Sequence, residues 1–272
     1  MATTLKLAMI QLRTERELEK TLQKAERMLR EAAAKGAEIA VLPEMFCCPY
    51  DAAFFPAFAE HADEVRAVLS QWSRENRLLL VGGSLPEREG ERLYNTCFVY
   101  DEAGRQIARH RKVHLFDVDL PGMRFMESDS FAPGEEITTF ETRWGRMGAA
   151  ICFDLRFPEL FRAMARRGAQ IIFLPAQFNQ KTGPAHWELS LRARAVDNEL
   201  FVVGASAAKD AGFSYESWGH SMAVDPFGEV LASCGDEETI LYADLDLDRI
   251  ARVRRQLPTF LHLREELYEV AK

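Results

Sequence analysis

The sequence predicts a single α/β domain. Segments with strand-like and helix-like patterns alternate from one end of the 272-residue chain to the other, which is typical of layered α/β folds. Hydrophobic residues make up 47% of the chain, enough to form a full core. Because no linker, low-complexity tract or internal repeat divides the chain, we expect one domain over residues 1–272.

The first half of the chain begins with a predicted strand at residues 5–12. A helix follows, in which apolar residues recur at helical spacing: Leu18, Leu22, Ala25, Leu29 and Ala32. Gly36 follows them, as is typical of a helix end. Next we expect a buried strand at 37–44 that ends at Glu44, and a helix at 62–76. Turn residues then separate three further strands, at 78–84, 95–101 and 106–115.

The second half of the chain repeats this alternation. A strand at 147–153 precedes a helix that Pro158 begins and Gly168 ends. A further strand, helix and strand are then predicted in turn, at 169–175, 183–199 and 200–207. The chain closes with a hairpin at 220–234, a strand at 239–247 and a helix that ends before Pro258.

Charge and composition exclude several classes of partner. The net charge is −8 and no basic stripe stands out, so we expect neither a nucleic-acid nor a membrane partner. No apolar run approaches the roughly 20 residues of a membrane helix, and the first residues do not resemble a signal peptide. An odd number of cysteines, five, argues against a disulfide framework, so a cytoplasmic location is predicted.

Three chemically capable side chains follow predicted strands. Glu44 ends one strand, Lys112 lies in or just after another, and Cys152 ends a third. In layered α/β folds, sites gather beyond the carboxyl ends of strands. These three residues, far apart in sequence, are therefore expected to meet in one pocket.

Each of these residues has a functional and a purely structural interpretation. Cys152 is either a small core side chain or a nucleophile, with the helix that begins at Pro158 favouring its thiolate. Glu44 either faces water or, if partly buried, accepts the thiol proton. Lys112 belongs either to a solvated basic patch or to an oxyanion site. Taken singly, the residues leave these alternatives open.

The remaining candidates are less specific. Glu127 is either a loop carboxylate or part of the same site. The histidines have no spacing typical of metal ligands, so no metal site is predicted; they are His114, His186 and His220. A Cys–His dyad with one of them stays open, although no local signature supports it.

Together, the motifs resemble a known family. The segments LPE with Glu44, RKVHLFDVDLPG with Lys112 and GAAICFDLRFPEL with Cys152, with FMES and its Glu127 between the last two, resemble the Glu-Lys-Cys signature of the nitrilase (carbon–nitrogen hydrolase) superfamily. The similarity covers nearly the whole chain and is greatest to the ω-amidase type of the Nit branch. Nitrilases carry Trp-Glu after the cysteine, whereas Phe153 and Asp154 stand here, which favours an amide substrate over a nitrile.

The resemblance implies a four-layer αββα sandwich and a set of catalytic roles. Cys152 would attack the amide carbonyl and form a thioester, with Glu44 as its general base. Lys112 and the backbone N–H of Phe153 would hold the oxyanion. Glu127 would orient Lys112 and the substrate. The family reaction requires no cofactor.

The resemblance also implies how the substrate is bound. Arg156, four residues after the cysteine, would hold a substrate carboxylate with two hydrogen bonds. Phe178 and Thr182 would contact the substrate. The implied substrates are short α-keto acids with a terminal amide, such as α-ketoglutaramate and α-ketosuccinamate. Two structural alternatives stay open: Arg156 capping a strand edge, and Phe178 lying in the core.

Other functions of the same branch remain in competition. An amidase for deaminated glutathione, or for another small amide, would differ in the wall beyond the scissile bond, which we expect from residues 47–58 and 212–219. A catalytically silent scaffold protein is the non-enzymatic alternative. By family resemblance we also expect a homodimer, or a higher homo-oligomer, that pairs through the helix at 158–168 and the region 185–196.

Overall fold

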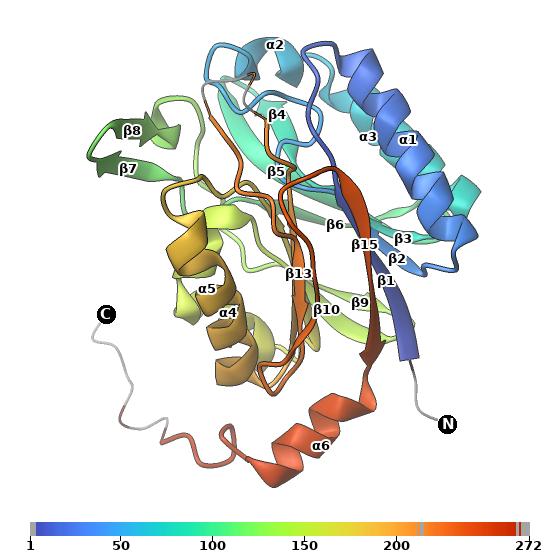
Figure 1. The fold of residues 1–272 in the computed structure, drawn as a ribbon, viewed down its shortest axis with the longest axis vertical. Coiled ribbons are helices and arrows are strands. Elements are labelled where there is room, and N and C mark those ends of the chain that lie inside the picture. Colours follow the sequence, from blue (N-terminus) through green and yellow to red (C-terminus); the bar gives the residue numbers. More distant parts are fainter. Residues whose placement is uncertain (1–3, 211, 213–214, 265–266, 268–272) are drawn as a thin grey trace.

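The computed structural model describes residues 4–210, 212, 215–264 and 267 (Figure 1). Its first β-sheet has seven strands: β1 (Thr4–Gln11), β2 (Ile39–Val41), β3 (Leu79–Val81), β4 (Leu85–Glu89), β5 (Arg92–Tyr100), β6 (Gln106–Arg111) and β15 (Thr239–Asp246). The strand order is β15-β1-β2-β3-β5-β4, and β6 pairs with β5. The three strands β1, β2 and β3 are parallel, and antiparallel strands extend the sheet on both sides.

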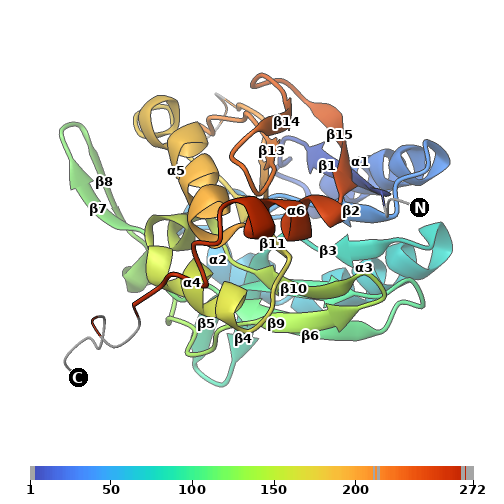
Figure 2. The ribbon, with the colours of Figure 1, turned by 90° about the horizontal axis from the view of Figure 1, so that it is seen from below.

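The second sheet has six strands: β9 (Thr139–Thr142), β10 (Gly145–Ala149), β11 (Ile171–Ala176), β12 (Phe201–Ser206), β13 (Met222–Val224) and β14 (Val230–Ser233). It repeats the plan of the first, because β10, β11 and β12 are parallel and their neighbours antiparallel. A separate hairpin of β7 (Asp117–Leu120) and β8 (Met123–Met126) projects from the body (Figure 2).

Helices cover the outer face of each sheet. Figure 2 shows α1 (Leu18–Ala34) and α3 (Ala62–Asn76) beside the first sheet, and α4 (Pro158–Arg166) and α5 (Gly183–Asn198) beside the second. Two further helices lie at the ends of the layers: α2 (Phe55–Ala59) and α6 (Asp248–Gln256). The predicted αββα sandwich is therefore confirmed. Among the described residues, no helix combines the length and apolar composition that a membrane crossing requires.

The alternation of side chains along β1 explains why the strands are apolar throughout. Leu5, Leu7 and Met9 pack into the core between the two sheets. Ala8 and Ile10 point the other way and pack beneath α1 and α3. A strand buried on both faces reads as a continuous hydrophobic run, as this one does.

The predicted helices and strands are found, but several boundaries differ. The strand predicted at 37–44 ends at Val41, because Pro43 has no N–H with which to continue the ladder. Five short elements were not predicted: α2, β4, β7, β8 and β9. Most residues of β7 and β8 are only partly buried or exposed, and β4 is an edge strand with a proline and charged residues. Their sequences therefore carry little hydrophobic alternation.

One end of the sandwich collects the residues that follow the strands. The carboxyl ends of β2 and β6 meet the amino-terminal half of the antiparallel β5 at this end of the first sheet. The segments that follow β10 and β11 in the second sheet reach the same place. Because the sheets are stacked, side chains from both can line one site.

Candidate active site

Glu44 lies in a turn that follows β2, and its side chain is fully buried. The turn is held from the neighbouring loop, where the Ser84 hydroxyl accepts a hydrogen bond of 3.0 Å from the Met45 N–H. Gly83 makes this close approach possible, since it has a φ of +63° and a Cβ there would stand 2.2 Å from the Pro43 carbonyl oxygen. The loop after β3 thus fixes the carboxylate that follows β2.

Lys112, directly after β6, is buried and contacts two carboxylates. Its Nζ lies 2.8 Å from Glu44 Oε1 and 2.8 Å from Glu127 Oε2. Burial by itself lowers the pKa of the ammonium, but the charges of Glu127 and Glu44 outweigh burial, so the pKa lies well above its usual range. Lys112 is therefore a cation at neutral pH, despite having no contact with bulk water.

Glu127 begins a short 3₁₀ turn (Glu127–Asp129) at the base of the β7–β8 hairpin. The Phe116 N–H, at the other end of the hairpin, donates a hydrogen bond of 2.6 Å to Glu127 Oε2. The Glu127 N–H in turn donates to the Phe116 carbonyl oxygen. The hairpin therefore closes on Glu127, the residue that contacts Lys112. Because Lys112 also contacts Glu44, the two glutamates lie in the same cluster.

Asn95 completes this buried cluster, and the sequence analysis did not identify it. Its Nδ2 donates hydrogen bonds to Glu44 Oε1 (2.8 Å) and Glu127 Oε1 (3.1 Å). The signal available in the sequence was a polar amide within the buried strand β5, on the same face as the buried Cys97. Such a residue needs buried polar partners, and here they are the two carboxylates.

Cys152 follows β10 at a sharp corner and begins a 3₁₀ turn (Cys152–Arg156). Its φ is +44°, a left-handed conformation that costs a non-glycine residue about 1–2 kcal/mol. Backbone strain of this kind is common at functional sites. The corner aims the thiol at the cluster formed by Glu44 and Lys112, which both interact with it.

Burial and the Glu44 charge raise the pKa of the Cys152 thiol well above its usual range, although Lys112 and the Gln177 backbone N–H oppose them. Burial also raises the pKa of Glu44. The Lys112 ammonium opposes this rise and favours the Glu44 carboxylate, whereas Cys152 favours its thiol form. Glu44 Oε2 is buried and accepts no hydrogen bond within the described part of the chain. This oxygen is available for the thiol proton.

Asp154 connects the turn at Cys152 to the segment around Lys112. Its buried carboxylate accepts hydrogen bonds from the Ile151 N–H (2.9 Å), the His114 N–H (3.0 Å) and the His114 Nδ1 (2.8 Å), and His110 Nε2 lies 3.1 Å away. Burial alone would raise the pKa of Asp154, but the hydrogen bonds of both histidines lower it strongly. The signal in the sequence was the aspartate two residues after the cysteine, which the sequence analysis used only to distinguish amide from nitrile substrates.

The histidines have other partners than the thiol. His114 bonds Asp154, His186 Nδ1 lies 3.0 Å from the Arg156 guanidinium, and His220 bonds the Trp218 carbonyl oxygen. The group beside the thiol is the Glu44 carboxylate, so the structure does not favour a Cys–His dyad. The described residues contain no cluster of three or more metal-ligating side chains.

A small pocket opens above Cys152, and all four predicted substrate-binding residues line it. They are Phe153, Arg156, Phe178 and Thr182, and the other lining residues are Phe116, Asn179 and Tyr215. The pocket encloses about 10 Å³, enough for about one water molecule. Any organic substrate therefore requires the lining side chains to move apart.

Arg156 is half-buried beside the thiol. Its guanidinium lies over the rings of Phe153 (5.5 Å) and Phe178 (5.2 Å) and has no carboxylate partner in the described ranges. Burial lowers its pKa, although the charge of Cys152 opposes this. A desolvated guanidinium without a counter-ion is suited to an anionic ligand. The structure does not show Arg156 capping a strand edge.

The other predicted binding residues surround this guanidinium. Phe178 is buried, as the core alternative required, yet its ring also lines the pocket. Thr182 is the residue directly before α5, and its N–H and hydroxyl both donate hydrogen bonds to Asn179 Oδ1.

The predicted wall of the pocket is only partly described. From the 47–58 segment, Tyr50 packs against Tyr215 of the 212–219 segment, with ring centroids 4.8 Å apart. Two residues of the second segment, Phe213 and Ser214, lie outside the described residues.

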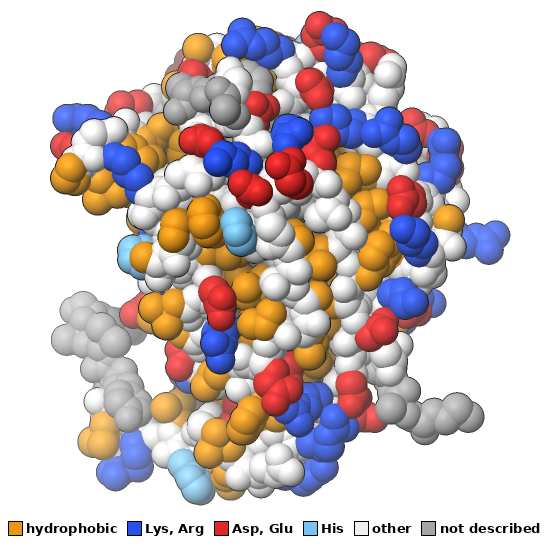
Figure 3. Space-filling model, in the orientation of Figure 1, with side chains coloured by type: hydrophobic (Ala, Val, Ile, Leu, Met, Phe, Trp, Pro, Cys, Tyr) orange, Lys and Arg blue, Asp and Glu red, His pale blue; other side chains and the backbone are white. Residues whose placement is uncertain are grey.

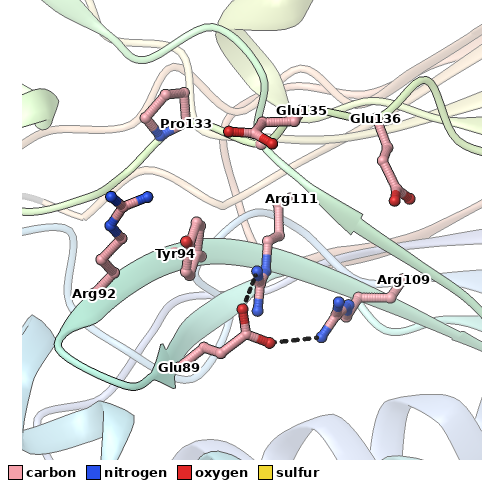
Figure 4. Close-up of a pocket in the computed structure, with 9 residues that line it drawn as sticks. Glu89, Arg92, Tyr94, Arg109, Arg111, Pro133, Glu135 and Glu136 are labelled. Carbon is pink, nitrogen blue, oxygen red and sulfur yellow. Dashed lines mark hydrogen bonds and ion pairs between the residues drawn. The ribbon is translucent and has the colours of Figure 1, made fainter.

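A larger hollow of about 220 Å³ lies on the outer side of β4, β5 and β6 (Figure 4). Its walls are charged: Figure 4 shows the Glu89 carboxylate between the guanidinium groups of Arg109 and Arg111. None of the predicted catalytic or substrate-binding residues lines this hollow. The convergence of predicted residues therefore distinguishes the smaller pocket as the candidate active site.

Comparison with known proteins agrees with this geometry. Residues 6–255 match the carbon–nitrogen hydrolase family. The chain belongs to this family. The match includes all of the carbon–nitrogen hydrolase motif residues discussed above, from Glu44 to Thr182.

Individual carbon–nitrogen hydrolases resemble the chain over almost its whole length. It is 46% identical to the omega-amidase NIT2 of Bos taurus over 269 residues, which are 98% of each protein. It is 37% identical to the crystal structure of Saccharomyces cerevisiae Nit3, with a TM-score of 0.88 and 94% of both chains covered. It is 27% identical to an amidase variant from Nesterenkonia sp. AN1, whose active-site cysteine carries a covalent acetamide group (TM-score 0.79; 95% and 97% covered).

Proposed function

We propose that this protein is an ω-amidase, which hydrolyses the terminal amide of a short α-keto dicarboxylic acid monoamide to the acid and ammonia. The observation that carries the proposal is the meeting of Cys152, its carboxylate and ammonium neighbours, and Arg156 at one small pocket. The Arg156 guanidinium has no carboxylate partner among the described residues. The identity to omega-amidases from several vertebrates supports the same substrate class. Family membership also favours an enzyme over a silent scaffold protein.

The first half of the reaction forms a thioester. Glu44 Oε2 takes the thiol proton as the Cys152 sulfur attacks the amide carbon, and the carbonyl oxygen becomes an oxyanion. Lys112 and the Phe153 N–H stabilise this charge. Glu44 then gives its proton to the amide nitrogen, the C–N bond breaks, and ammonia leaves.

The second half releases the acid. A water molecule attacks the thioester carbon while Glu44 takes one of its protons, and the same two groups hold the new oxyanion. The C–S bond then breaks, the acid leaves, and the proton on Glu44 returns to the sulfur. Glu127 keeps Lys112 in place throughout, because its carboxylate lies 2.8 Å from Nζ. Water is the only co-substrate, and no cofactor is needed.

The pocket favours a short anionic substrate. Arg156 would hold the carboxylate at the α-keto end, while the amide reaches the sulfur. Phe178 and Thr182 would line the space between these ends. α-Ketoglutaramate and α-ketosuccinamate have this form. The identity to omega-amidases favours them over deaminated glutathione, which carries a longer peptide portion on the same kind of amide.

An ammonia-release assay tests the proposal. We expect turnover of both short keto-acid amides to exceed that of deaminated glutathione and of simple neutral amides. Cys152→Ala should remove turnover while its circular dichroism spectrum matches that of the wild type. A preference for deaminated glutathione would overturn the substrate assignment, and full turnover by Cys152→Ala would overturn the catalytic one.

We also propose a homodimer in the cytoplasm. Large apolar side chains are exposed on α5 and on the adjoining β13–β14 turn: Leu189 (67%), Val196 (42%) and Phe227 (54%). Figure 3 shows hydrophobic side chains over this part of the surface. The α4 and α5 helices would pair with their copies. Analytical ultracentrifugation would contradict the proposal if the protein sedimented as a monomer at micromolar concentration.

A further inference from the structure

Asn95 forms hydrogen bonds with all three charged residues of the buried cluster, two through its side-chain amide and one through its backbone. Its Nδ2 donates to Glu44 Oε1 (2.8 Å) and to Glu127 Oε1 (3.1 Å). Its backbone carbonyl oxygen accepts a hydrogen bond of 2.9 Å from the Lys112 N–H. An amide nitrogen carries two hydrogens, so both are used on the two carboxylates.

The chemistry of an amide matters at this position. The cluster contains two carboxylates and one ammonium, all fully buried, so the carboxylates repel each other across Lys112. Asn95 supplies two hydrogen-bond donors and adds no charge. An aspartate would add a third negative charge or, when protonated, offer a single donor. An apolar side chain would offer none.

The two bonds to Glu44 Oε1 leave its other oxygen free. Oε1 accepts from Lys112 Nζ and from Asn95 Nδ2, both at 2.8 Å. Oε2 is buried and has no hydrogen-bond donor among the described residues. A carboxylate fixed through one oxygen cannot rotate without breaking both bonds. Oε2 therefore keeps its position, and the Cys152 side chain is the remaining hydrogen-bonding neighbour of this carboxylate.

Asn95 Oδ1 points to the same conclusion. It is buried and finds no donor in the described part of the chain. An unsatisfied buried acceptor is unfavourable for folding. Among the described residues, the Asn95 side chain therefore forms hydrogen bonds only through Nδ2, which donates to the two carboxylates.

We propose that Asn95 is a positioning residue of the reaction: it holds Glu44 and Glu127 so that Glu44 Oε2 remains free to take the Cys152 thiol proton. The inference rests on the catalytic roles given under Proposed function. It predicts that Asn95 governs the ease of proton transfer from the thiol and contributes little to substrate binding.

The test compares Asn95→Ala and Asn95→Asp with the wild type. A hydrogen bond to a carboxylate stabilises its charged form, so its loss should raise the pKa of Glu44. The acid limb of the pH profile should therefore move to higher pH in both variants, further in Asn95→Asp. We expect kcat to fall about 10- to 100-fold with little change in KM. Cys97→Ala is the matched control, because Cys97 lies on the same strand in the core between the sheets.

The rate of Cys152 alkylation by iodoacetamide, measured against pH, gives a readout that does not depend on the substrate. The same shift of the acid limb is expected there. An unmoved limb together with a kcat like that of Cys97→Ala would overturn the proposal. If Asn95→Ala fails to fold, Asn95→Asp, which has nearly the same shape, decides alone. A shifted alkylation limb in a protein that releases no ammonia from keto-acid amides would support Asn95 and refute the proposed substrate.

Discussion

Lys112→Met tests whether one ammonium neutralises both carboxylates of the site. The substitution keeps a long unbranched side chain but removes the charge that lies 2.8 Å from Glu44 and from Glu127. Both carboxylates are fully buried. Removing one partner of a buried ion pair costs about 3–5 kcal/mol in the free energy of unfolding. For a chain of this size, the melting temperature should fall by about 6–20 °C.

The loss should depend on pH in a defined direction. Without Lys112, the two carboxyl groups repel each other, and their pKa values in the folded variant should lie above those of the unfolded chain. A carboxyl group whose pKa is raised in the folded state favours folding at a pH below its pKa in the unfolded chain, which is about 4.3 for Glu. This contribution to stability is lost as the pH rises through the pKa of the folded state. The variant should therefore approach wild-type stability near pH 5 and show most of its deficit at pH 8.

Urea unfolding at pH 5 and pH 8 measures this difference. The wild type provides the baseline, since burial already raises the pKa of Glu44 in it. Adding Glu127→Gln to Lys112→Met removes one of the repelling charges and should restore part of the stability at pH 8. Equal deficits at the two pH values, or no effect of the second substitution, would refute the electrostatic reasoning.

Two further predictions concern Arg156 and Asp154. For Arg156→Gln, kcat/KM for α-ketoglutaramate should fall about 10- to 100-fold, as expected for a lost charge-assisted hydrogen bond. The rate on a neutral amide such as propionamide should change little. Steady-state kinetics with both amides checks this, and equal losses on both would contradict the role of Arg156. Asp154→Asn should lower the free energy of unfolding by about 2–3 kcal/mol at pH 7, because the amide nitrogen would face donors from Ile151 and His114. Since the pKa of Asp154 is lowered in the fold, the extra stability of the wild type over Asp154→Asn should shrink as the pH falls below about 4. Urea titrations measure the free energy of unfolding of both proteins. A difference that stays constant between pH 7 and pH 3 would contradict this role of Asp154.

Local patterns were sufficient to predict most elements of the fold. The helix at 62–76 was predicted with its observed boundaries, because its apolar spacing and its flanking residues are all local features. The β7–β8 hairpin was not predicted, since its residues alternate weakly and it is held at its base by Glu127. That contact joins two ends of a loop and leaves no periodic trace in the sequence.

The same contrast between local patterns and long-range contacts applies to the residues of the site. Glu44, Lys112 and Cys152 stood out because each is a reactive side chain at or near the end of a predicted strand. Asn95 and Asp154 were missed because their importance lies in the partners they meet across the fold. Asn95 finds its carboxylates 51 and 32 residues away in the chain. No local pattern records contacts of that kind.

The sequence by itself determined the class of the fold, the reactive residues and the family, because periodicity and motif order are properties of the chain read in one direction. Only the tertiary structure decided that Lys112 contacts two carboxylates. It also decided that, among the described residues, Glu44 Oε2 has no hydrogen-bond partner and Arg156 has no carboxylate partner. These are facts about burial and direction. They arise when two stacked sheets bring the ends of distant strands together in a place that water does not reach, where each missing or extra charge has a large effect.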